Sequence, residues 1–308
     1  MPGERKEGYF NKIRQEAKYK TIKELHEAKN YPIFVLCEIL KITRSSYYKW
    51  LNRVETKQER ENHEIAQIIL EYHELFERIL GYRRMTYWIN RLNQRQYNEK
   101  RIRRLMRMMG ISAVIRRKRK GHKKSTPEVT AENVLNREFS ATKPNEKWLT
   151  DVTEFKIKGT QTKLYLSAIL DIYDKSIISY YMGTSNNNHL VFKTFDLAIK
   201  LNSNAKPMFH NDRGYQYTSK IFKNKLEQQG MTQSMSRVGR CIDNGPMEAF
   251  WGTLKAEMYY LHQFHDINEL KSSIIKYIKF YNEQRFQAKL KGLTPTAYRN
   301  QALSQLNI

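Results

Sequence analysis

The chain is poor in cysteine and has no long apolar run. Only two cysteines, Cys37 and Cys241, occur in 308 residues, and neither they nor the eight scattered histidines have the spacing of a zinc site. We therefore expect neither a disulfide framework nor structural zinc, as in a reducing, cytoplasmic compartment. No apolar run approaches the roughly 18 residues that span a bilayer. The first residues also lack the apolar core of a secretion signal, so no membrane partner is expected.

Acidic residues are scarce, and aspartate is missing from the first 150 positions. The chain has 31 acidic against 55 basic residues, a formal charge of +24. Residues 1–147 carry 34 basic and 18 acidic residues, whereas residues 148–308 carry 21 and 13. A basic front half indicates a polyanionic partner such as nucleic acid, and the later aspartates suit a site that uses metal ions.

The front half has helical patterns throughout. Helices are predicted near 10–30, 33–40 and 43–51, the last capped by Thr43. A short helix, a tight turn and a capped helix are typical of a helix-turn-helix, although an ordinary helical hairpin would show the same pattern. In a helix-turn-helix the second helix would present four side chains to DNA: Arg44, Ser45, Ser46 and Lys49.

A second helical group follows. Apolar spacing predicts a helix over 57–80 closed by Gly81, a helix from 82 to about 92, and a helix over 100–109 capped by Asn98. A basic run then begins, which suits a flexible tether that neutralises DNA phosphates: Arg116, Arg117, Lys118, Arg119 and Lys120. Residues 125–145 have the composition of a linker.

The back half alternates between strand and helix patterns. Strands are predicted near 148–157, 163–172, 175–182, 206–210 and 231–235, and helices near 189–201, 218–229, around Glu248, and 266–283. Asp151 falls inside the first strand, Asp212 follows the fourth, and Glu248 lies near the start of its helix. Taken alone, each carboxylate could be a solvated surface charge or a helix cap.

The sequence around these carboxylates is distinctive. The motifs are Trp148-x-Thr150-Asp151, His210-x-Asp212-x-Gly214-x-Gln216-Tyr217, and Asp243-Asn244-x-x-x-Glu248-x-Phe250-x-x-x-Leu254-Lys255, with Tyr281-Asn282-x-x-Arg285 and Leu290-x-Gly292-Leu293-Thr294-Pro295-x-x-Tyr298 behind them. Together they resemble the bacterial insertion-sequence transposases of the DDE superfamily, whose catalytic half is like retroviral integrase. The resemblance covers roughly residues 30–300 and implies a ribonuclease-H-like core.

The resemblance assigns the three carboxylates to catalysis. Asp151, Asp212 and Glu248 would bind two Mg²⁺ ions, with Mn²⁺ as a possible substitute, because hard cations prefer oxygen ligands. Lys255, seven residues after Glu248, would contact the DNA end. Asn244 would either cap the Glu248 helix or touch DNA, and His210 would either line the site or pack within its strand. In the second helical group, the expected DNA contacts are Arg83, Arg84, Arg101 and Arg104.

The expected fold is multidomain: an all-α helix-turn-helix region, an α/β ribonuclease-H-like core with a mixed five-stranded sheet, and a helical C-terminal tail. The expected boundaries are 1–55 for the helix-turn-helix region, 56–115 for a second helical DNA-binding domain, 116–145 for a basic linker, 146–262 for the core and 263–308 for the tail.

The expected function is that of a transposase. It would bind the terminal inverted repeats of its element as a homo-oligomer on paired double-stranded DNA ends, nick DNA, and transfer the strand to target DNA by attack of a 3′-hydroxyl. The upstream-frame product of a frameshifting element is a possible further partner, and bacterial nucleoid association is expected. Two alternatives are a DNA-binding regulator with a relic catalytic domain and a ribonuclease-H-type nuclease without joining activity.

Overall fold

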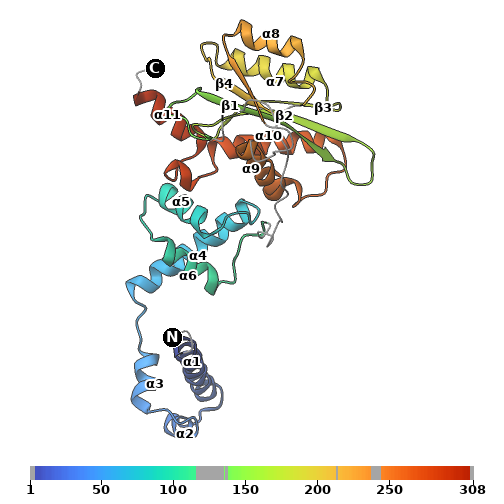
Figure 1. Cartoon of the computed structure of the whole chain (residues 1–308). Coiled ribbons are helices and arrows are strands. Elements are labelled where there is room, and N and C mark those ends of the chain that lie inside the picture. Colours follow the sequence, from blue (N-terminus) through green and yellow to red (C-terminus); the bar gives the residue numbers. More distant parts are fainter. Residues whose placement is uncertain (1–3, 116–134, 136–137, 213, 237–243, 306–308) are drawn as a thin grey trace. The chain divides into compact units, whose positions relative to one another are not determined.

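A computed structural model describes residues 4–115, 135, 138–212, 214–236 and 244–305, with side chains from residue 15 onward. Figure 1 traces these elements along the chain. The chain divides into two compact units, Met1–Gln67 and Ile68–Ile308. Arg116, Arg117, Lys118, Arg119, Lys120 and Cys241 lie outside the described residues.

The first unit has the predicted helix–turn–helix order. Its helices are α1 (Glu4–Lys29), α2 (Ile33–Ile39) and α3 (Arg44–Leu51). Thr43 caps α3 as predicted, because its side chain accepts a hydrogen bond from the Ser46 amide. A small core joins the three helices through buried side chains: Ile22, Leu36, Cys37 and Tyr47. The start of α4 (Lys57–Leu75) also belongs to this unit.

The predicted end of the next helix is wrong. The structure ends α4 at Leu75, five residues early, because Glu77 and Arg78 take left-handed φ angles of 48° and 64°. Ile79 and Leu80 are buried in the turn that follows, which explains why the apolar pattern continues. Gly81 does not close α4; it is the N-cap of α5 (Tyr82–Leu92). The third predicted helix is α6 (Glu99–Met108), with Asn98 as its cap.

The mixed five-stranded sheet of the prediction is confirmed, with the order β3-β2-β1-β4-β5. Strands β1 (Lys147–Lys156), β2 (Lys163–Asp171) and β3 (Ile177–Gly183) form an antiparallel meander. Strands β4 (Met208–Asn211) and β5 (Thr232–Met235) are parallel to β1. β1 therefore lies at the centre of the sheet, with antiparallel β2 on one side and parallel β4 on the other.

Helices cover both faces of this sheet (Figure 1). On one face, α7 (Asn188–Leu201) and α8 (Lys220–Gln228) pack on Trp148 and Phe209. On the other face, α9 (Gly245–Leu254) and α10 (Ile267–Glu283) pack on Leu149 and its neighbours. α10 shares this core with the strands, so the segment expected as a tail contributes directly to the core. The chain continues through η3 (Ala288–Leu290) to α11 (Pro295–Gln305).

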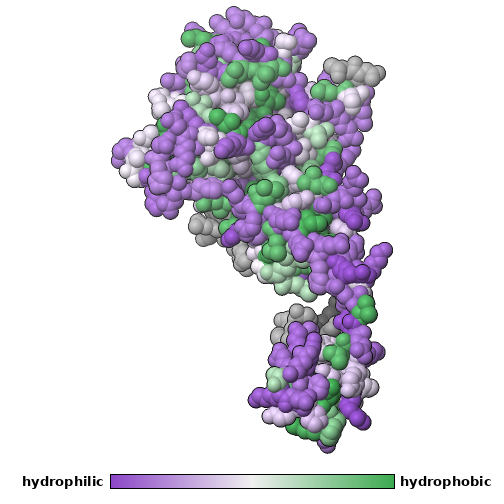
Figure 2. Space-filling model, turned by 180° about the vertical axis from the view of Figure 1, so that it is seen from behind, coloured by the Kyte–Doolittle hydropathy of each residue, from purple (hydrophilic) through white to green (hydrophobic). Residues whose placement is uncertain are grey.

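The surface agrees with the charged composition. Figure 2 shows mostly hydrophilic residues on one face of the molecule, with hydrophobic residues in separate patches. Within the described part of the chain, no helix has both the length and the apolar character that crossing a membrane requires.

Candidate active site

Asp151 lies in the central strand of the sheet. Its neighbour Thr150 is fixed on both sides, because the Thr150 hydroxyl donates to the Ala168 carbonyl at 3.0 Å and lies 3.2 Å from the Tyr217 hydroxyl. The carboxylate of Asp151 is also held: Oδ1 accepts from the Val152 amide at 2.8 Å. Asp151 therefore lies in a strand segment that pairs with β2, and a backbone hydrogen bond holds one of its carboxylate oxygens.

Asp212 follows the parallel strand β4 directly. Leu149 of β1 pairs with His210 of β4 in the last pair of that register, and Asp212 stands one residue after β4 ends at Asn211. The charge of Asp212 acts on Asp151, so the two carboxylates lie within electrostatic range of one another. The Gly214 amide donates to Asp212 Oδ1 at 2.9 Å. A Cβ atom at Gly214 would lie 3.0 Å from that oxygen, so a larger residue there would crowd the Asp212 carboxylate.

Glu248 comes from α9, which crosses β1. Asn244 occupies the N-cap position of α9, as one of its two alternatives had it, but its side chain makes no cap bond. The side-chain amide of Asn244 donates to the Thr150 carbonyl at 3.0 Å. This hydrogen bond joins the start of α9 to β1 beside Asp151. One turn after Glu248, the Trp251 indole N–H donates to Asp151 Oδ2 at 3.0 Å.

Trp251 is the site residue that the sequence analysis missed. It stands three positions after Glu248, and residues three apart lie on the same face of a helix. That spacing could have indicated that Trp251 faces the same strand as Glu248. Its side chain is buried, while Glu248 on the first turn remains exposed. α9 thus brings one acid and one hydrogen-bond donor to Asp151.

The electrostatics link the three carboxylates. Burial, together with the negative charges of Asp212 and Glu248, raises the pKa of Asp151 to about 6, against the hydrogen bonds from Val152 and Trp251. Three segments far apart in sequence therefore come within electrostatic range of one another at Asp151, in the middle of β1. Mutual repulsion opposes ionisation of these carboxylates, while the hydrogen bonds from Val152 and Trp251 favour the ionised form of Asp151.

The donor set fits a hard divalent cation chemically, since it offers carboxylate oxygens whose negative charges repel one another. The arrangement is nevertheless not a finished metal site. Among the described residues, no group of three or more His, Cys, Asp or Glu side chains is placed so that it could hold a metal ion.

The flanking candidates separate into different environments. His210 is the packed strand residue of its two alternatives: it is 1% exposed, and its ring nitrogens lie 2.9 and 3.1 Å from the hydroxyls of Ser234 and Ser236. Lys255 does not continue the face of α9, because α9 ends at Leu254 and Lys255 begins the π-helix η2 (Lys255–Tyr259). The Lys255 ammonium lies 5.2 Å from the centre of the Phe155 ring. Burial lowers the pKa of Lys255, opposed by the charges of Glu154 and Asp151.

The expected DNA contacts also differ in exposure. The four candidates on α3 are exposed, as are Arg83 and Arg104, while Arg101 is half-buried against the Tyr97 ring. Arg84 differs from its neighbour Arg83. Its side chain is 15% exposed and its Nη1 lies 3.0 Å from Glu257 Oε1, so the position expected to contact DNA faces the protein interior.

Comparison with known families gives the class. Models of an integrase core domain match residues 141–241 and residues 248–303, and a model of an HTH-like domain matches residues 59–119. The two core matches contain all three carboxylates and all five strands of the sheet. The HTH-like match covers α4–α6 rather than α2 and α3. The fold is thus that of an integrase core domain preceded by helical domains.

The relatives are transposases. The chain is 41% identical over 283 residues to the putative transposase InsK for insertion sequence element IS150 of Escherichia coli K12, covering 92% of this chain and 98% of that one. It is 40% identical over 207 residues to an uncharacterized transposase-like protein of Haemophilus influenzae, covering 67% of this chain and 95% of that one. The chain belongs to the insertion-sequence transposases with a retroviral-integrase-like core.

Among solved structures, the HTLV-2 integrase catalytic core domain in complex with magnesium aligns with a TM-score of 0.41 and 22% identity. The alignment covers 51% of this chain and 97% of that one.

Proposed function

We propose that this transposase binds the terminal inverted repeats of its own element and catalyses DNA nicking, followed by strand transfer through attack of a 3′-hydroxyl on a phosphodiester. The observation that carries the proposal is the surroundings of Asp151: the Val152 amide and the Trp251 indole hold its carboxylate, and the charges of Asp212 and Glu248, from other parts of the fold, act on it. Clustered acids of this kind are candidates for functional sites.

Asp151, Asp212 and Glu248 would hold two Mg²⁺ ions, which when bound would activate the attacking oxygen and stabilise the leaving one. Hydrogen bonds from the chain hold two of these three carboxylates in place. Val152 and Trp251 hold the two oxygens of Asp151, and the Gly214 amide holds Asp212. Partners of this kind orient metal ligands and tune their affinity.

The helical domains would bind the DNA. Support comes from the HTH-like match over residues 59–119 and from the exposed arginines of α6, a helix with four arginines in ten residues. Such cations neutralise phosphates, and those that reach base edges supply specificity. We propose residues 56–115 as the principal end-binding domain, with α3 as a second DNA contact and a homo-oligomer holding the paired ends.

The test uses the full chain and duplexes carrying the ends of its own element, with Mg²⁺ or with EDTA. Wild type should nick and join the duplex only with Mg²⁺, and Asp212→Asn should bind the same ends without forming products. Strand transfer by Asp212→Asn would falsify the assignment of the site. Binding without any wild-type product would favour the regulator alternative, and hydrolysis without joining would favour the nuclease.

A further inference from the structure

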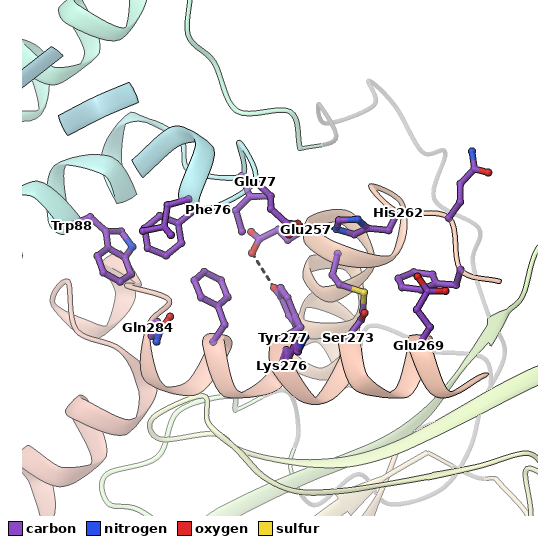
Figure 3. Close-up of a pocket in the computed structure, with 16 residues that line it drawn as sticks. Phe76, Glu77, Trp88, Glu257, His262, Glu269, Ser273, Lys276, Tyr277 and Gln284 are labelled. Atoms are coloured by element: carbon purple, nitrogen blue, oxygen red, sulfur yellow. Dashed lines mark hydrogen bonds and ion pairs between the residues drawn. The ribbon is translucent and has the colours of Figure 1, made fainter. Parts of the chain in front are cut away.

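The segment that begins at the end of α4 packs against the C-terminal part of the core. Phe76 stacks near Phe280 with ring centres 6.0 Å apart, and Trp88 meets Phe286 edge-on at 5.1 Å. A groove of about 710 Å³ runs along this junction, lined by Trp88, Glu257 and Tyr277 among others (Figure 3). Residues of the proposed DNA-binding domain and of the core therefore share one apolar contact.

A buried ionic cluster accompanies this contact. Glu257 is 5% exposed. Arg285 binds it through two hydrogen bonds of 2.9 Å, and the Tyr277 hydroxyl donates to it at 2.9 Å, as the dashed line in Figure 3 shows. Arg84 of α5 adds an ion pair at 3.0 Å, and its other terminal nitrogen donates to the Ile79 carbonyl at 3.0 Å.

The charges in this cluster do not balance. Glu257 and Arg285 already form a neutral, bidentate pair, so Arg84 brings a second buried cation to one carboxylate. Burial lowers the pKa of Arg84 despite the charge of Glu257, whereas Arg285 and Arg84 hold the pKa of Glu257 below its usual range against its own burial. Burying this second cation is costly in free energy, because one carboxylate must offset the desolvation of two guanidinium groups.

The position of Glu257 connects this ionic cluster to the helix that carries Glu248. Glu257 lies in η2, which continues α9 without a break, nine residues after Glu248. At 1.5 Å per residue the two carboxylates are separated by roughly 13 Å along the helix. π turns inside helices are frequent at functional sites. A group that fixes Glu257 therefore fixes the far end of the helix that carries Glu248.

We propose that Arg84 is a positioning residue: it reaches from the domain that binds the element's ends to Glu257, and so sets the orientation of the catalytic helix. The proposal rests on the proposed function for its activity readout. It assigns Arg84 no contact with DNA. Docking of residues 76–92 on the core then influences the active site through one helix, without any movement of the sheet.

The experiment compares Arg84→Met with Lys223→Met in the full chain. Lys223 of α8 forms an exposed ion pair with Glu227 at 3.8 Å, so it is a matched cation outside both the cluster and the proposed DNA-binding domains. For Arg84→Met we expect the rate of nicking at saturating DNA to fall about 10- to 100-fold, since small displacements of catalytic groups have effects of this size. Its Kd for the element's ends should stay within about twofold of wild type, and Lys223→Met should change neither quantity.

A second measurement, amide hydrogen exchange, tests the proposal without depending on catalytic activity. Amide hydrogen exchange across residues 245–259 should become faster in Arg84→Met without DNA, because the far end of the helix is released. Arg84→Lys, which keeps the charge but loses the planar fork, should recover part of the rate. Glu257→Gln should lower the rate similarly, and the double variant Arg84→Met/Glu257→Gln should lose less than the sum of the two.

The outcomes separate the explanations. A weaker Kd with an unchanged rate at saturating DNA would make Arg84 a DNA contact and overturn the proposal. A lower Tm with an unchanged rate and unchanged exchange over residues 245–259 would make its role purely structural, which also overturns it. If wild type itself yields no Mg²⁺-dependent product, the proposed function fails, while the exchange result still tests the link between Arg84 and the helix.

Discussion

Two groups of acids centre on neighbouring strands of the same sheet, on Asp151 of β1 and on Asp171 of β2, and they differ in what surrounds them. The pKa of Asp151 on β1 is raised by burial and by the negative charges of Asp212 and Glu248. Asp171, at the end of β2, lies beside Asp174, and a single guanidinium nitrogen of Arg299 reaches both carboxylates, at 2.8 and 2.7 Å. The Asn145 amide also donates to Asp171 at 2.7 Å.

The pKa values of these two aspartates do not distinguish the groups. Burial raises the pKa of Asp151 and that of Asp171 to about 6, and in each case a neighbouring acid adds to the effect. The partners do distinguish them. Asp171 and Asp174 share an arginine from α11, whereas no lysine or arginine within the described ranges forms an ion pair with Asp151. Asp171 and Asp174 thus hold the fold together, and Asp151 is left available for an external cation.

The largest effect should come from removing the cation of the structural group. Arg299→Met leaves two fully buried carboxylates without their shared partner, and breaking a buried ion pair from one side costs about 3–5 kcal/mol. Urea unfolding at pH 7 measures the loss. A cost below about 1 kcal/mol would remove the distinction between the two groups.

Neutralising the active-site acid should have the opposite sign. Burial and the neighbouring acids raise the pKa of Asp151 from its ordinary value of 3.8 to about 6 in the folded chain, so its ionised form destabilises the fold. This penalty is absent below about pH 4, grows as the pH rises, and is complete above about pH 6. Without metal, Asp151→Asn should therefore raise the free energy of unfolding at pH 7 by about 1–3 kcal/mol and leave it unchanged at pH 4.

The same unfolding experiment with Mg²⁺ sharpens the comparison. Mg²⁺ should stabilise wild type at pH 7 and have little effect on Asp151→Asn, because ligands that bind only the folded state raise its stability. Asp171→Asn is the control from the other group. It should still respond to Mg²⁺, and an equal loss of response in both variants would contradict the assignment.

A smaller effect is expected from Trp251→Phe, which removes one N–H and keeps most of the ring. Losing this hydrogen bond to Asp151 should raise the Mg²⁺ concentration for half-maximal nicking about 10-fold, as expected for the partner of a metal ligand. The DNA affinity and the Tm should change little. Calorimetric titration of the DNA-free protein with Mg²⁺ checks the same shift independently of catalysis.

The smallest effect should follow Tyr217→Phe. The Tyr217 hydroxyl lies 3.2 Å from that of Thr150, which keeps its bond to Ala168 in the variant. Loss of one buried hydrogen bond costs about 1 kcal/mol. Thermal unfolding measures this cost, and a several-fold change in Mg²⁺ requirement would show that the hydroxyl affects Asp151 more directly than the geometry indicates.

The sheet could be predicted from sequence because its signals are local. Strand periodicity extends over a few residues, and so do the motifs around Asp151, Asp212 and Glu248, on which the proposal for the three acids depends. The contacts of Trp251 and Arg84 could not, since their partners lie 100 and 173 positions away. Arg84 and Arg83 are identical side chains in adjacent positions, and only packing decides that one is buried. The end of α4 was missed because Ile79 and Leu80 continue the apolar pattern through a turn.

The π turn from Lys255 to Tyr259 restricts chain length as well as residue type. In an α-helix each amide bonds the carbonyl four residues before it, whereas in this turn the Tyr260 amide bonds the Lys255 carbonyl, five residues before it, so the turn holds one extra residue. Deleting one residue here would convert the turn to regular α-helix and change the register of Glu257 relative to Glu248. No single substitution could restore that register. Related transposases should therefore keep nine steps between their counterparts of Glu248 and Glu257, or change that spacing only together with a compensating insertion or deletion nearby.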